Sequence, residues 1–389
     1  MPLSPPPGQA DISRRLRFGG LSCAALAALR VFFDTQAFRH QQYGGISRYY
    51  AELIRLLPSY GIEPVVRLPP LDNQHAIVSG LSDGRWARTL TAHPILRWFY
   101  YWGLGSYDHV WAAIENYDVL HRTYYAMPWS AGKPSVCTVV DMIPEALPHY
   151  FPEGNPHMHK REVVRDSDLV LSISESTSRD LVRFYGCSPR QVVTVPLGID
   201  AEAFTQQACM PHPFRRPYIL FVGMRHRYKN FGRFATAAAR VLAAHDVSLA
   251  LVGGGPLQDG EREVFAKAGV AERVVQASVP DTLLPTIYKE AEMFVFPSEY
   301  EGFGLPILES FACSCPVVAS RASCFPEVGG EAMEYFDPYA FEDIAQAMER
   351  VLLSPTRAKE LRRLGSERVK AYSWQRTAEL TAAAYNRLS

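Results

Sequence analysis

Short apolar runs alternate with segments of helical periodicity along most of the chain. In the first half, the runs that predict strands are residues 31–33, 136–140, 169–174 and 192–195. Helices are predicted between them at 46–57, where apolar residues recur at helical spacing, and at 174–185, with Ser174 as the cap and Gly186 as the end. This order is typical of a doubly wound domain, in which helices connect parallel strands.

The second half repeats the pattern after a stretch, 197–217, that contains Pro211, Pro213 and Pro217 and that reads as a linker. Strands are predicted at 218–222, 247–252, 274–276, 293–296 and 317–319. Helices are predicted at 231–244, 282–291, 341–353, 355–372 and 374–388. The sequence therefore predicts an α/β chain of two Rossmann-like, doubly wound domains facing a cleft, with ligands at the carboxyl ends of the strands.

Composition supports two domains and narrows the classes of partner. The chain has 389 residues, 48% of them hydrophobic, and its 40 basic and 40 acidic side chains cancel. Zero net charge argues against nucleic acid as the main partner and leaves small charged ligands open. The 7 cysteines include no Cys-x-x-Cys pair, so neither a disulfide framework nor a zinc site is expected, and a reducing compartment fits.

The N-terminal residues bear on the location of the protein. A basic cluster at 14–17 precedes an apolar stretch at 18–29, which superficially resembles a secretory signal. The stretch has no convincing cleavage site and is shorter than the ~20 residues of a spanning helix, so we expect a cytoplasmic protein that could touch the inner membrane. The predicted units are an extension at 1–29, domains at 30–205 and 206–374, and a C-terminal helix at 375–389 that packs back on the first domain.

The segment 297–309 carries the strongest functional pattern. It sets Glu301 and Glu309 eight positions apart across a glycine-bearing turn. Pro306 fits the first position of a helix, whose free amides would form an anion site. One carboxylate could hold sugar hydroxyls and the other a ribose, which suits a sugar diphosphate. The spacing alone would equally fit a solvated helix after a common Gly-x-Gly turn.

The residues around the two glutamates change that balance. The segment reads Pro-Ser-x-x-Glu-Gly-Phe-Gly-Leu-Pro-x-x-Glu and resembles the Glu-x7-Glu motif of family-4 retaining glycosyltransferases. The resemblance implies that Glu301 contacts the transferred sugar and that Glu309 contacts the nucleotide ribose. It also implies that the backbone of the turn faces the donor, at Gly302, Phe303, Gly304 and Leu305.

A basic loop follows the first predicted strand of the second domain. Arg225, Arg227 and Lys229 precede a helix there, where cations can clamp a diphosphate and stabilise the charge that builds on it. A solvated basic loop would have the same composition. The loop is similar to the family's Gly-x-Arg-x-x-x-Lys-Asn segment, which implies that Gly223 lies at the donor and that Arg225 and Lys229 act on its phosphates, with Arg227 a weaker candidate.

Weaker segments also match the family. Gly253 lies in a glycine turn after a strand, similar to a Val-Gly-x-Gly turn, and Val279 precedes a helix in a segment that resembles the one that meets the base. Gly44 and Gly45 precede a first-domain helix and resemble a glycine loop near the donor phosphates and the acceptor. Each could equally be a simple turn or connection.

The first domain adds two candidates and one departure from the family. His121 and Tyr124 lie in a segment similar to a family His-x-Thr-Tyr-Tyr near the acceptor or sugar, although His121 could also be a core histidine. Many relatives read Thr-Val-His-Asp where this chain has Val140 and Asp141 at the end of a strand. Valine cannot donate a hydrogen bond or transfer a proton, so either Asp141 assumes part of that role or the histidine is dispensable.

Taken as a whole, the resemblance implies the GT-B architecture and retaining transfer of a hexose from a nucleotide sugar, without a cofactor or a metal. The segments 43–49 and 121–125 are most similar to mannosyltransferases of bacterial surface polysaccharides, which favours GDP-mannose as donor and a saccharide or lipid-linked saccharide as acceptor. The alternatives are another donor, such as UDP-glucose or a deoxysugar nucleotide, a catalytically silent sugar-nucleotide-binding protein, and a phosphorylase of the same architecture.

Overall fold

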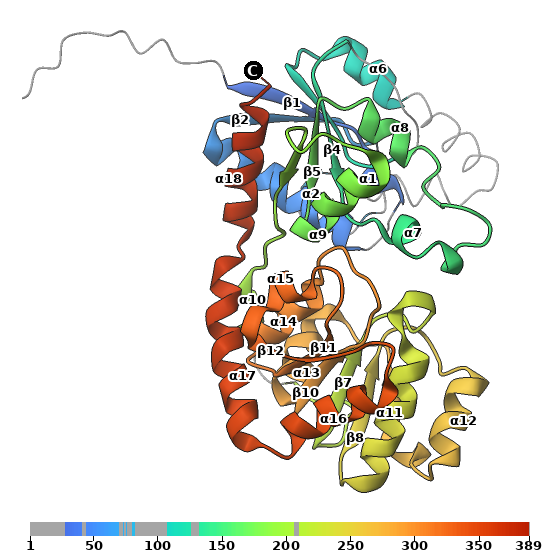
Figure 1. Cartoon of the computed structure of the whole chain (residues 1–389). Coiled ribbons are helices and arrows are strands. Elements are labelled where there is room, and N and C mark those ends of the chain that lie inside the picture. Colours follow the sequence, from blue (N-terminus) through green and yellow to red (C-terminus); the bar gives the residue numbers. More distant parts are fainter. Residues whose placement is uncertain are drawn as a thin grey trace, which may run out of the picture.

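The computed structural model describes residues 28–40, 44–69, 73, 75, 80–81, 107–125, 132–205 and 210–388, so the extension predicted at 1–29 lies almost wholly outside the described residues. Figure 1 shows two α/β bodies, one above the other, each built on a sheet flanked by helices. Both sheets have six strands, and every strand pair is parallel. The predicted fold class, an α/β chain with two doubly wound domains, is confirmed.

The first sheet has the strand order β2-β1-β3-β4-β5-β6. Its strands are β1 (Leu29–Phe33), β2 (Ile62–Val66), β3 (Val119–Arg122), β4 (Ser135–Val139), β5 (Leu169–Ser172) and β6 (Val192–Thr194). The described helices of this body are α1 (Gln36–His40), α2 (Gly45–Leu56), α6 (Tyr107–Ile114), α7 (Ile143–Ala146), α8 (Lys160–Arg165) and α9 (Glu175–Asp180). Ser174 caps α9 by accepting from the amide of Thr177, and the helix continues as a π-helical turn to Gly186, whose left-handed conformation ends it.

The second sheet has the order β12-β11-β10-β7-β8-β9. Its strands are β7 (Tyr218–Val222), β8 (Ser248–Val252), β9 (Val274–Ala277), β10 (Met293–Phe296), β11 (Val317–Ser320) and β12 (Met333–Phe336). Its helices include α11 (Phe231–Ala244), α12 (Asp259–Lys267), α13 (Leu284–Glu290), α14 (Leu305–Ala312), α15 (Phe325–Gly329), α16 (Phe341–Leu352) and α17 (Pro355–Arg368). The linker between the two sheets contains the short helix α10 (Ala201–Thr205).

Three of the described strands, β2, β3 and β12, were not predicted from the sequence. β2 and β12 are edge strands, and β2 contains Pro64, which an edge tolerates because one side of the strand has no ladder partner. β3 is a central strand in which only Val119 and Leu120 are apolar, and its other two residues, His121 and Arg122, are buried polar side chains. Apolar runs identify buried strands, so a strand with two buried polar residues gives no such signal.

The chain returns to the first body at its C-terminal end. Figure 1 shows α17 along the second body and α18 (Trp374–Tyr385) alongside the first, where α18 contacts α2. The hydroxyl of Tyr385 lies 2.5 Å from Nδ1 of His121 on β3, and the rings of Trp374 and Tyr49 lie 6.4 Å apart. The two bodies are therefore joined by two chain crossings, and the second crossing leads from α17 on the second body to α18 on the first.

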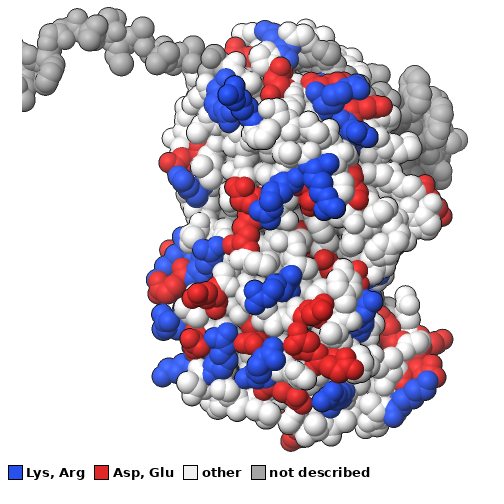
Figure 2. All heavy atoms as spheres, viewed as in Figure 1, with Lys and Arg blue, Asp and Glu red and all other residues white. Residues whose placement is uncertain are grey.

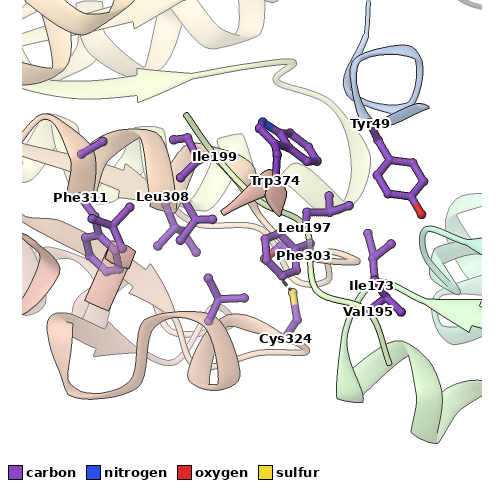
Figure 3. Close-up of a cluster of buried hydrophobic side chains, with 14 of the residues drawn as sticks. Tyr49, Ile173, Val195, Leu197, Ile199, Phe303, Leu308, Phe311, Cys324 and Trp374 are labelled. Atoms are coloured by element: carbon purple, nitrogen blue, oxygen red, sulfur yellow. Dashed lines mark hydrogen bonds between the residues drawn. The ribbon is translucent and has the colours of Figure 1, made fainter. Parts of the chain in front are cut away.

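A continuous apolar cluster fills the region between the bodies. Tyr49, Ile173 and Val195 from the first body converge with Phe303 from the second and Trp374 from the C-terminal segment (Figure 3). All five side chains are at most 5% exposed. Burial of apolar surface stabilises by about 25 cal/mol per Å², so this cluster favours a fixed arrangement of the two domains.

The two crossings meet at Gly198. A Cβ atom at this position would lie 2.2 Å from both the carbonyl carbon of Ser373 and the amide nitrogen of Trp374. We expect Gly198→Ala to lower the free energy of unfolding by about 1–3 kcal/mol, because backbone must move to admit the methyl group. The control is Gly232→Ala in α11, where a Cβ has open space and alanine should stabilise by about 0.4–1 kcal/mol. Urea unfolding followed by circular dichroism measures both, and equal midpoints for the two variants would contradict the crossing as a constraint.

Candidate active site

A cavity of about 450 Å³ lies between the carboxyl ends of the two sheets. The first body lines it with residues that follow β4 and β5 and with the start of α2, and the second body lines it with the ends of β7 and β10, the basic loop and the turn before α14. The lining residues are Gly45, Ile46, Tyr49, Val140, Asp141, Ile143, Ile173, Leu197, Val222, Gly223, Tyr228, Lys229, Phe296, Glu301, Gly302, Phe303, Gly304, Leu305 and Pro306. A cleft at the carboxyl ends of parallel strands is where open α/β sheets bind ligands.

Lys229 and Glu301 form the charged centre of this cavity. Nζ of Lys229 lies 2.6 Å from Oε1 of Glu301, and the same oxygen accepts a 2.7 Å hydrogen bond from Ser298. The amide of Glu301 donates to Ser323, so the residue is held at its backbone as well. Burial alone would lower the pKa of Lys229, but Glu301, Tyr228 and Asp141 outweigh it and the pKa is raised. The ammonium therefore stays charged in a partly dry site.

The turn before α14 brings backbone to the cavity wall. α14 begins at Leu305 with Pro306 in its first turn, and Gly304 precedes it with a left-handed φ of 96°. A side chain at Gly304 would be strained by that φ and would meet the ring of Phe325 at 3.0 Å. Gly302, Phe303, Gly304 and Leu305 all line the cavity, so the structure brings the four predicted turn residues together beside Glu301.

Arg225 lies apart from Lys229, although both come from the same loop. Its guanidinium donates to the carbonyls of Gly253, Gly255 and Pro256 at 2.8–2.9 Å and to the carboxylate of Glu261 at 3.2 Å. It is not among the residues that line the cavity. In this structure Arg225 therefore braces the glycine turn after β8, and a phosphate contact would require these bonds to exchange.

Glu309 lies further along α14, and it is not among the residues that line the cavity. Tyr288 donates to its Oε2 at 3.3 Å, and Arg48 on α2 lies 3.8 Å from its Oε1. Burial raises the pKa of Glu309, and the charge of Arg48 and the Tyr288 hydrogen bond oppose that rise. The two glutamates of the motif thus have separate surroundings: Glu301 is paired within the second domain, and Glu309 faces a cation of the first.

The remaining residues predicted to bind the donor are Gly44, Gly45, Gly223, Gly253 and Val279, and only Gly45 and Gly223 line the cavity. Gly45 lines the cavity opposite Leu305, whose Cδ1 is 3.8 Å from where a Cβ would be, and Gly44 precedes it at the start of α2. Gly223 lines the cavity at the end of β7, whereas Gly253 follows β8 with a φ of 82° and packs on Gly223. Val279 is partly buried against the apolar cluster and does not line the cavity.

Of the two interpretations of His121, the structure favours the core histidine, since the residue does not line the cavity. Its side chain is fully buried within the first sheet, with Nε2 2.9 Å from Oγ1 of Thr138 and the ring stacked on Phe33. Burial lowers its pKa to about 3. His121 is a core histidine that ties β3 to β4 and α18. Tyr124 is half-buried, stacks on Tyr125 and lies with its hydroxyl 3.4 Å from Nδ1 of His157, outside the cavity lining.

Val140 meets the second domain through its backbone carbonyl. A Cβ on Gly302 would lie 1.8 Å from the carbonyl oxygen of Val140 and 3.0 Å from Cβ of Asp141, so the contact of the two domains leaves no space for a side chain at position 302. Asp141 follows in the cavity wall, and its Oδ1 accepts from the amide of Ile143 at 3.1 Å. This contact between the domains therefore depends on a glycine in one and on a carbonyl in the other.

Polar contacts across the cleft were not predicted. The hydroxyl of Tyr300 donates to Asp180 of α9, and Tyr150 donates to Glu299 at 3.0 Å. Glu327 accepts from the amides at the start of α9, Glu175 at 2.8 Å and Ser176 at 3.1 Å. Glu327 lies in a Pro-Glu-Val turn, and a sequence does not reveal which helix of another domain such a carboxylate caps.

Neither the charges on the surface in view nor the metal-ligating side chains of the described residues indicate a second functional site. Figure 2 shows acidic and basic side chains side by side over the face in view. Within the described residues, no group of His, Cys, Asp and Glu could hold a metal ion, and no helix is long and apolar enough to cross a membrane. An Asp-x-Asp triplet occurs at Asp166 and Asp168, but it precedes β5, at the edge of the sheet away from the cavity, where Asp168 accepts from the amide of Ser135.

Two Rossmann-like domains that enclose a lysine, a glutamate and a glycine turn at their facing strand ends define a GT-B glycosyltransferase. Residues 43–203 match the family model described as Glycosyltransferase Family 4, and residues 207–368 match the model described as Glycosyl transferases group 1. The chain belongs to the family-4 glycosyltransferases, as its motifs predicted.

Curated relatives and solved structures agree with this assignment. The chain is 32% identical to the MMP alpha-(1->4)-mannosyltransferase of Mycolicibacterium hassiacum over 60% of its own length and 57% of that protein. It is 26% identical to the O-antigen chain mannosyltransferase B of Escherichia coli over 92% of its own length and 100% of that protein. A glycosyltransferase crystal structure from Rickettsia africae shares the fold, with a TM-score of 0.67 at 16% identity over 92% of this chain and 98% of that one.

The contact between Gly302 and Val140 yields a prediction about activity. We expect Gly302→Ala to reduce turnover about 100-fold, because displacement of a reacting group by about 1 Å can cost that much. The fold of each domain should survive, since the clash lies between domains. Steady-state turnover and the melting temperature measure the two effects. Gly260→Ala, at a glycine of α12 with open space around its Cβ position, is the control, and an active Gly302→Ala variant would contradict the contact.

The buried state of His121 yields a prediction about pH. Its pKa is about 3 in the folded chain and near 6.5 when unfolded, so the unfolded state takes up the proton first. Between these values, stability falls as the pH falls, by about 1.4 kcal/mol per pH unit. In His121→Gln this contribution is absent, so the difference in unfolding free energy between wild type and variant should shrink on acidification from pH 6.5 to 4.5. A constant difference would show that His121 is not buried in its neutral form.

Proposed function

We propose that the protein transfers mannose from GDP-mannose, with retention of configuration, to a saccharide or lipid-linked saccharide acceptor in the synthesis of a surface polysaccharide. The observation that carries the proposal is the Lys229–Glu301 pair beside the glycine turn, inside a cavity between the two domains. The choice of mannose is supported by the names of the two curated relatives, both mannosyltransferases, one of which the chain covers from end to end.

The second domain would hold the donor. Lys229 presents a charged ammonium that can bind a diphosphate oxygen and stabilise the negative charge that grows on the leaving phosphate. When the donor enters, Glu301 would exchange part of its bond with Lys229 for sugar hydroxyls. The buried Glu309 would accept from the ribose, and Arg225 would keep the glycine turn after β8 in shape for the nucleotide. No cofactor is needed, because the nucleotide sugar is itself a substrate.

The reaction would proceed at the boundary between the domains. The anomeric carbon would pass through an oxocarbenium-like state, and the acceptor would attack from the face that the diphosphate leaves. The departing phosphate oxygen would take the acceptor proton, so no histidine is required at Val140. A closed interface would limit hydrolysis by excluding water, and the main-chain contact of Gly302 with Val140 suits that role. Lys229 would supply the charge that a metal supplies elsewhere, and the protein would act in the cytoplasm, at or near the inner membrane.

A panel of nucleotide sugars tests this assignment directly. Purified protein with a saccharide acceptor would be supplied with GDP-mannose, UDP-glucose and a deoxysugar nucleotide, and nucleotide release would be followed. The anomeric configuration of the product would be read by NMR. We expect GDP-mannose to be the best donor, an α-linked product and loss of turnover in Glu301→Ala. A better donor among the others would correct the sugar, an inverted product would exclude retention, and binding without turnover would identify a catalytically silent protein.

Lys229 allows a quantitative test of donor binding. A charge-assisted hydrogen bond contributes about 1.5–3 kcal/mol, so Lys229→Ala should weaken donor binding about 10- to 100-fold. Lys267→Ala is the control, since it removes the same charge from an exposed i,i+4 pair on α12. Calorimetric titration with the nucleotide sugar measures both variants. Equal affinities would remove Lys229 from the donor site.

A further inference from the structure

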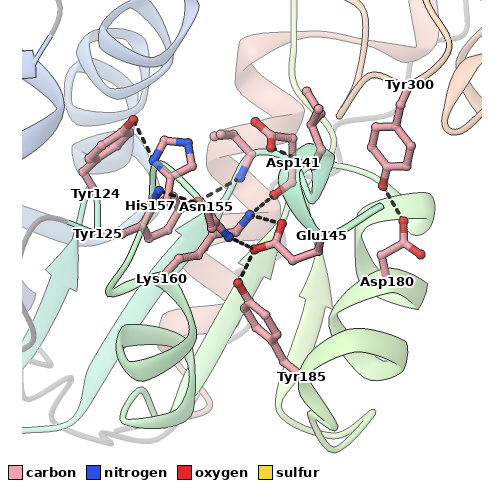
Figure 4. A network of polar contacts seen from close by, with 12 residues as sticks. Tyr124, Tyr125, Asp141, Glu145, Asn155, His157, Lys160, Asp180, Tyr185 and Tyr300 are labelled. Carbon is pink, nitrogen blue, oxygen red and sulfur yellow. Dashed lines mark hydrogen bonds and ion pairs between the residues drawn. The ribbon is translucent and has the colours of Figure 1, made fainter. Parts of the chain in front are cut away.

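A buried lysine of the first domain supports the cavity wall from behind. Lys160 begins α8, and its residue exposure is 0%. Its Nζ donates to the backbone carbonyl of Asp141 at 2.7 Å and to Oε2 of Glu145 at 3.0 Å, and it lies 5.8 Å from the ring centroid of Tyr125 (Figure 4). A buried ammonium is tolerated only when it is paired and hydrogen-bonded, and Lys160 meets both conditions.

Glu145 has further partners of its own. Asn155 donates to its Oε1 at 2.7 Å, and the hydroxyl of Tyr185 donates to the same oxygen (Figure 4). Burial alone would raise the pKa of Glu145, but the charge of Lys160 and the hydrogen bonds from Tyr185 and Lys160 outweigh it, and the pKa is lowered. An ammonium has three N–H groups, so the buried Lys160 needs acceptors besides Glu145. One of them is a carbonyl of the cavity wall, and this bond couples the ion pair to that wall.

That carbonyl belongs to the turn on which the domains meet. Val140 and Asp141 connect β4 to α7, and the carbonyl of Val140 receives Gly302 of the second domain. The turn has few other supports, namely a 3.3 Å bond from the amide of Val140 to the hydroxyl of Tyr125 and the bond from Ile143 to the Asp141 side chain. The Lys160 bond is the shortest of the three and comes from a side chain fixed by its own ion pair.

The turn is also linked electrostatically to the charged centre. The Asp141 carboxylate lines the cavity and contributes to the raised pKa of Lys229, after the larger effects of burial and Glu301. A shift of the turn would therefore move both the Val140 carbonyl that Gly302 contacts and the Asp141 carboxylate near Lys229. Interactions of this kind act on turnover because reacting groups must be held within fractions of an ångström.

We propose that Lys160 is a positioning residue for glycosyl transfer, which holds the Val140–Asp141 turn in place by its bond to the Asp141 carbonyl. The inference rests on the proposed function, since it concerns the closed cavity in which transfer would take place. Lys160 touches no substrate. It acts through backbone, from the side of the turn opposite the cavity.

A pair of variants separates this role from simple stabilisation. Lys160→Met alone leaves the Glu145 carboxylate without its cation and should lower the melting temperature. Lys160→Met combined with Glu145→Gln removes both charges and should recover much of that loss, because replacing a whole buried ion pair is tolerated far better than breaking one. Glu145→Gln alone also breaks the ion pair, but it keeps the Lys160 amine beside the Asp141 carbonyl, so it is the matched control for the loss of the pair itself.

Kinetics of the folded variants decide the matter. With the donor that turns over in the wild type, we expect the double variant to lose at least about 10-fold in kcat relative to Glu145→Gln, while its affinity for GDP alone changes less than about twofold. A double variant with the kcat of Glu145→Gln would overturn the positioning role and leave the proposed function standing. A kcat loss that only follows a loss of folded protein would overturn it too. A wild type without turnover on any donor would overturn the proposed function, and this inference with it.

Discussion

The approach of Gly302 to the carbonyl of Val140 is the constraint on which the arrangement of the site depends. Two backbones from different domains meet with no room for a side chain, and every group of the charged centre is placed relative to that contact. On one side, Glu301 and the turn to α14 follow β10; on the other, Asp141 continues from β4. Around the contact, the apolar cluster of Tyr49, Phe303 and Trp374 and the bonds from Tyr300 and Glu327 to α9 hold the domains in register.

The structure gives Lys229 and Arg225 different partners, although both cations lie in one short loop of the sequence. Lys229 and Glu301 neutralise one another inside the cavity, whereas Arg225 is spent on three carbonyls of the glycine turn and on Glu261. A cation with four bonds already made has little free energy to gain by moving to a phosphate, because each new bond replaces an old one. Among the described residues that line the cavity, Lys229 is the one with a positive charge, and Glu301 is its partner.

The sequence predicted the fold class and most strands from local pattern, and the resemblance of two short motifs to a known family singled out Lys229 and Glu301. A strand, a glycine turn and Pro306 at a helix start lie within a few positions of one another, so their contacts are nearly fixed by chain connectivity. His121 shows where this reasoning stops. From the sequence it could be either a residue near the acceptor or a core histidine, and the choice depends on its partners Thr138 and Tyr385, which come from distant parts of the chain. The cross-domain bonds of Tyr300 and Glu327 could not be predicted for the same reason.

The role of Lys160 could not be predicted from the sequence either. In the sequence it is one basic residue in a polar stretch, and its helix α8 was not predicted. The role of Lys160 follows from its burial, because the position of an ammonium without access to water is set by its acceptors. One of those acceptors is the backbone carbonyl of Asp141, behind the cavity wall. Val140 cannot bond a donor sugar through its side chain, so what this turn offers to the cleft is a main-chain surface and the Asp141 carboxylate. A main-chain surface is useful only when its position is fixed, and Lys160 fixes it from within the first domain.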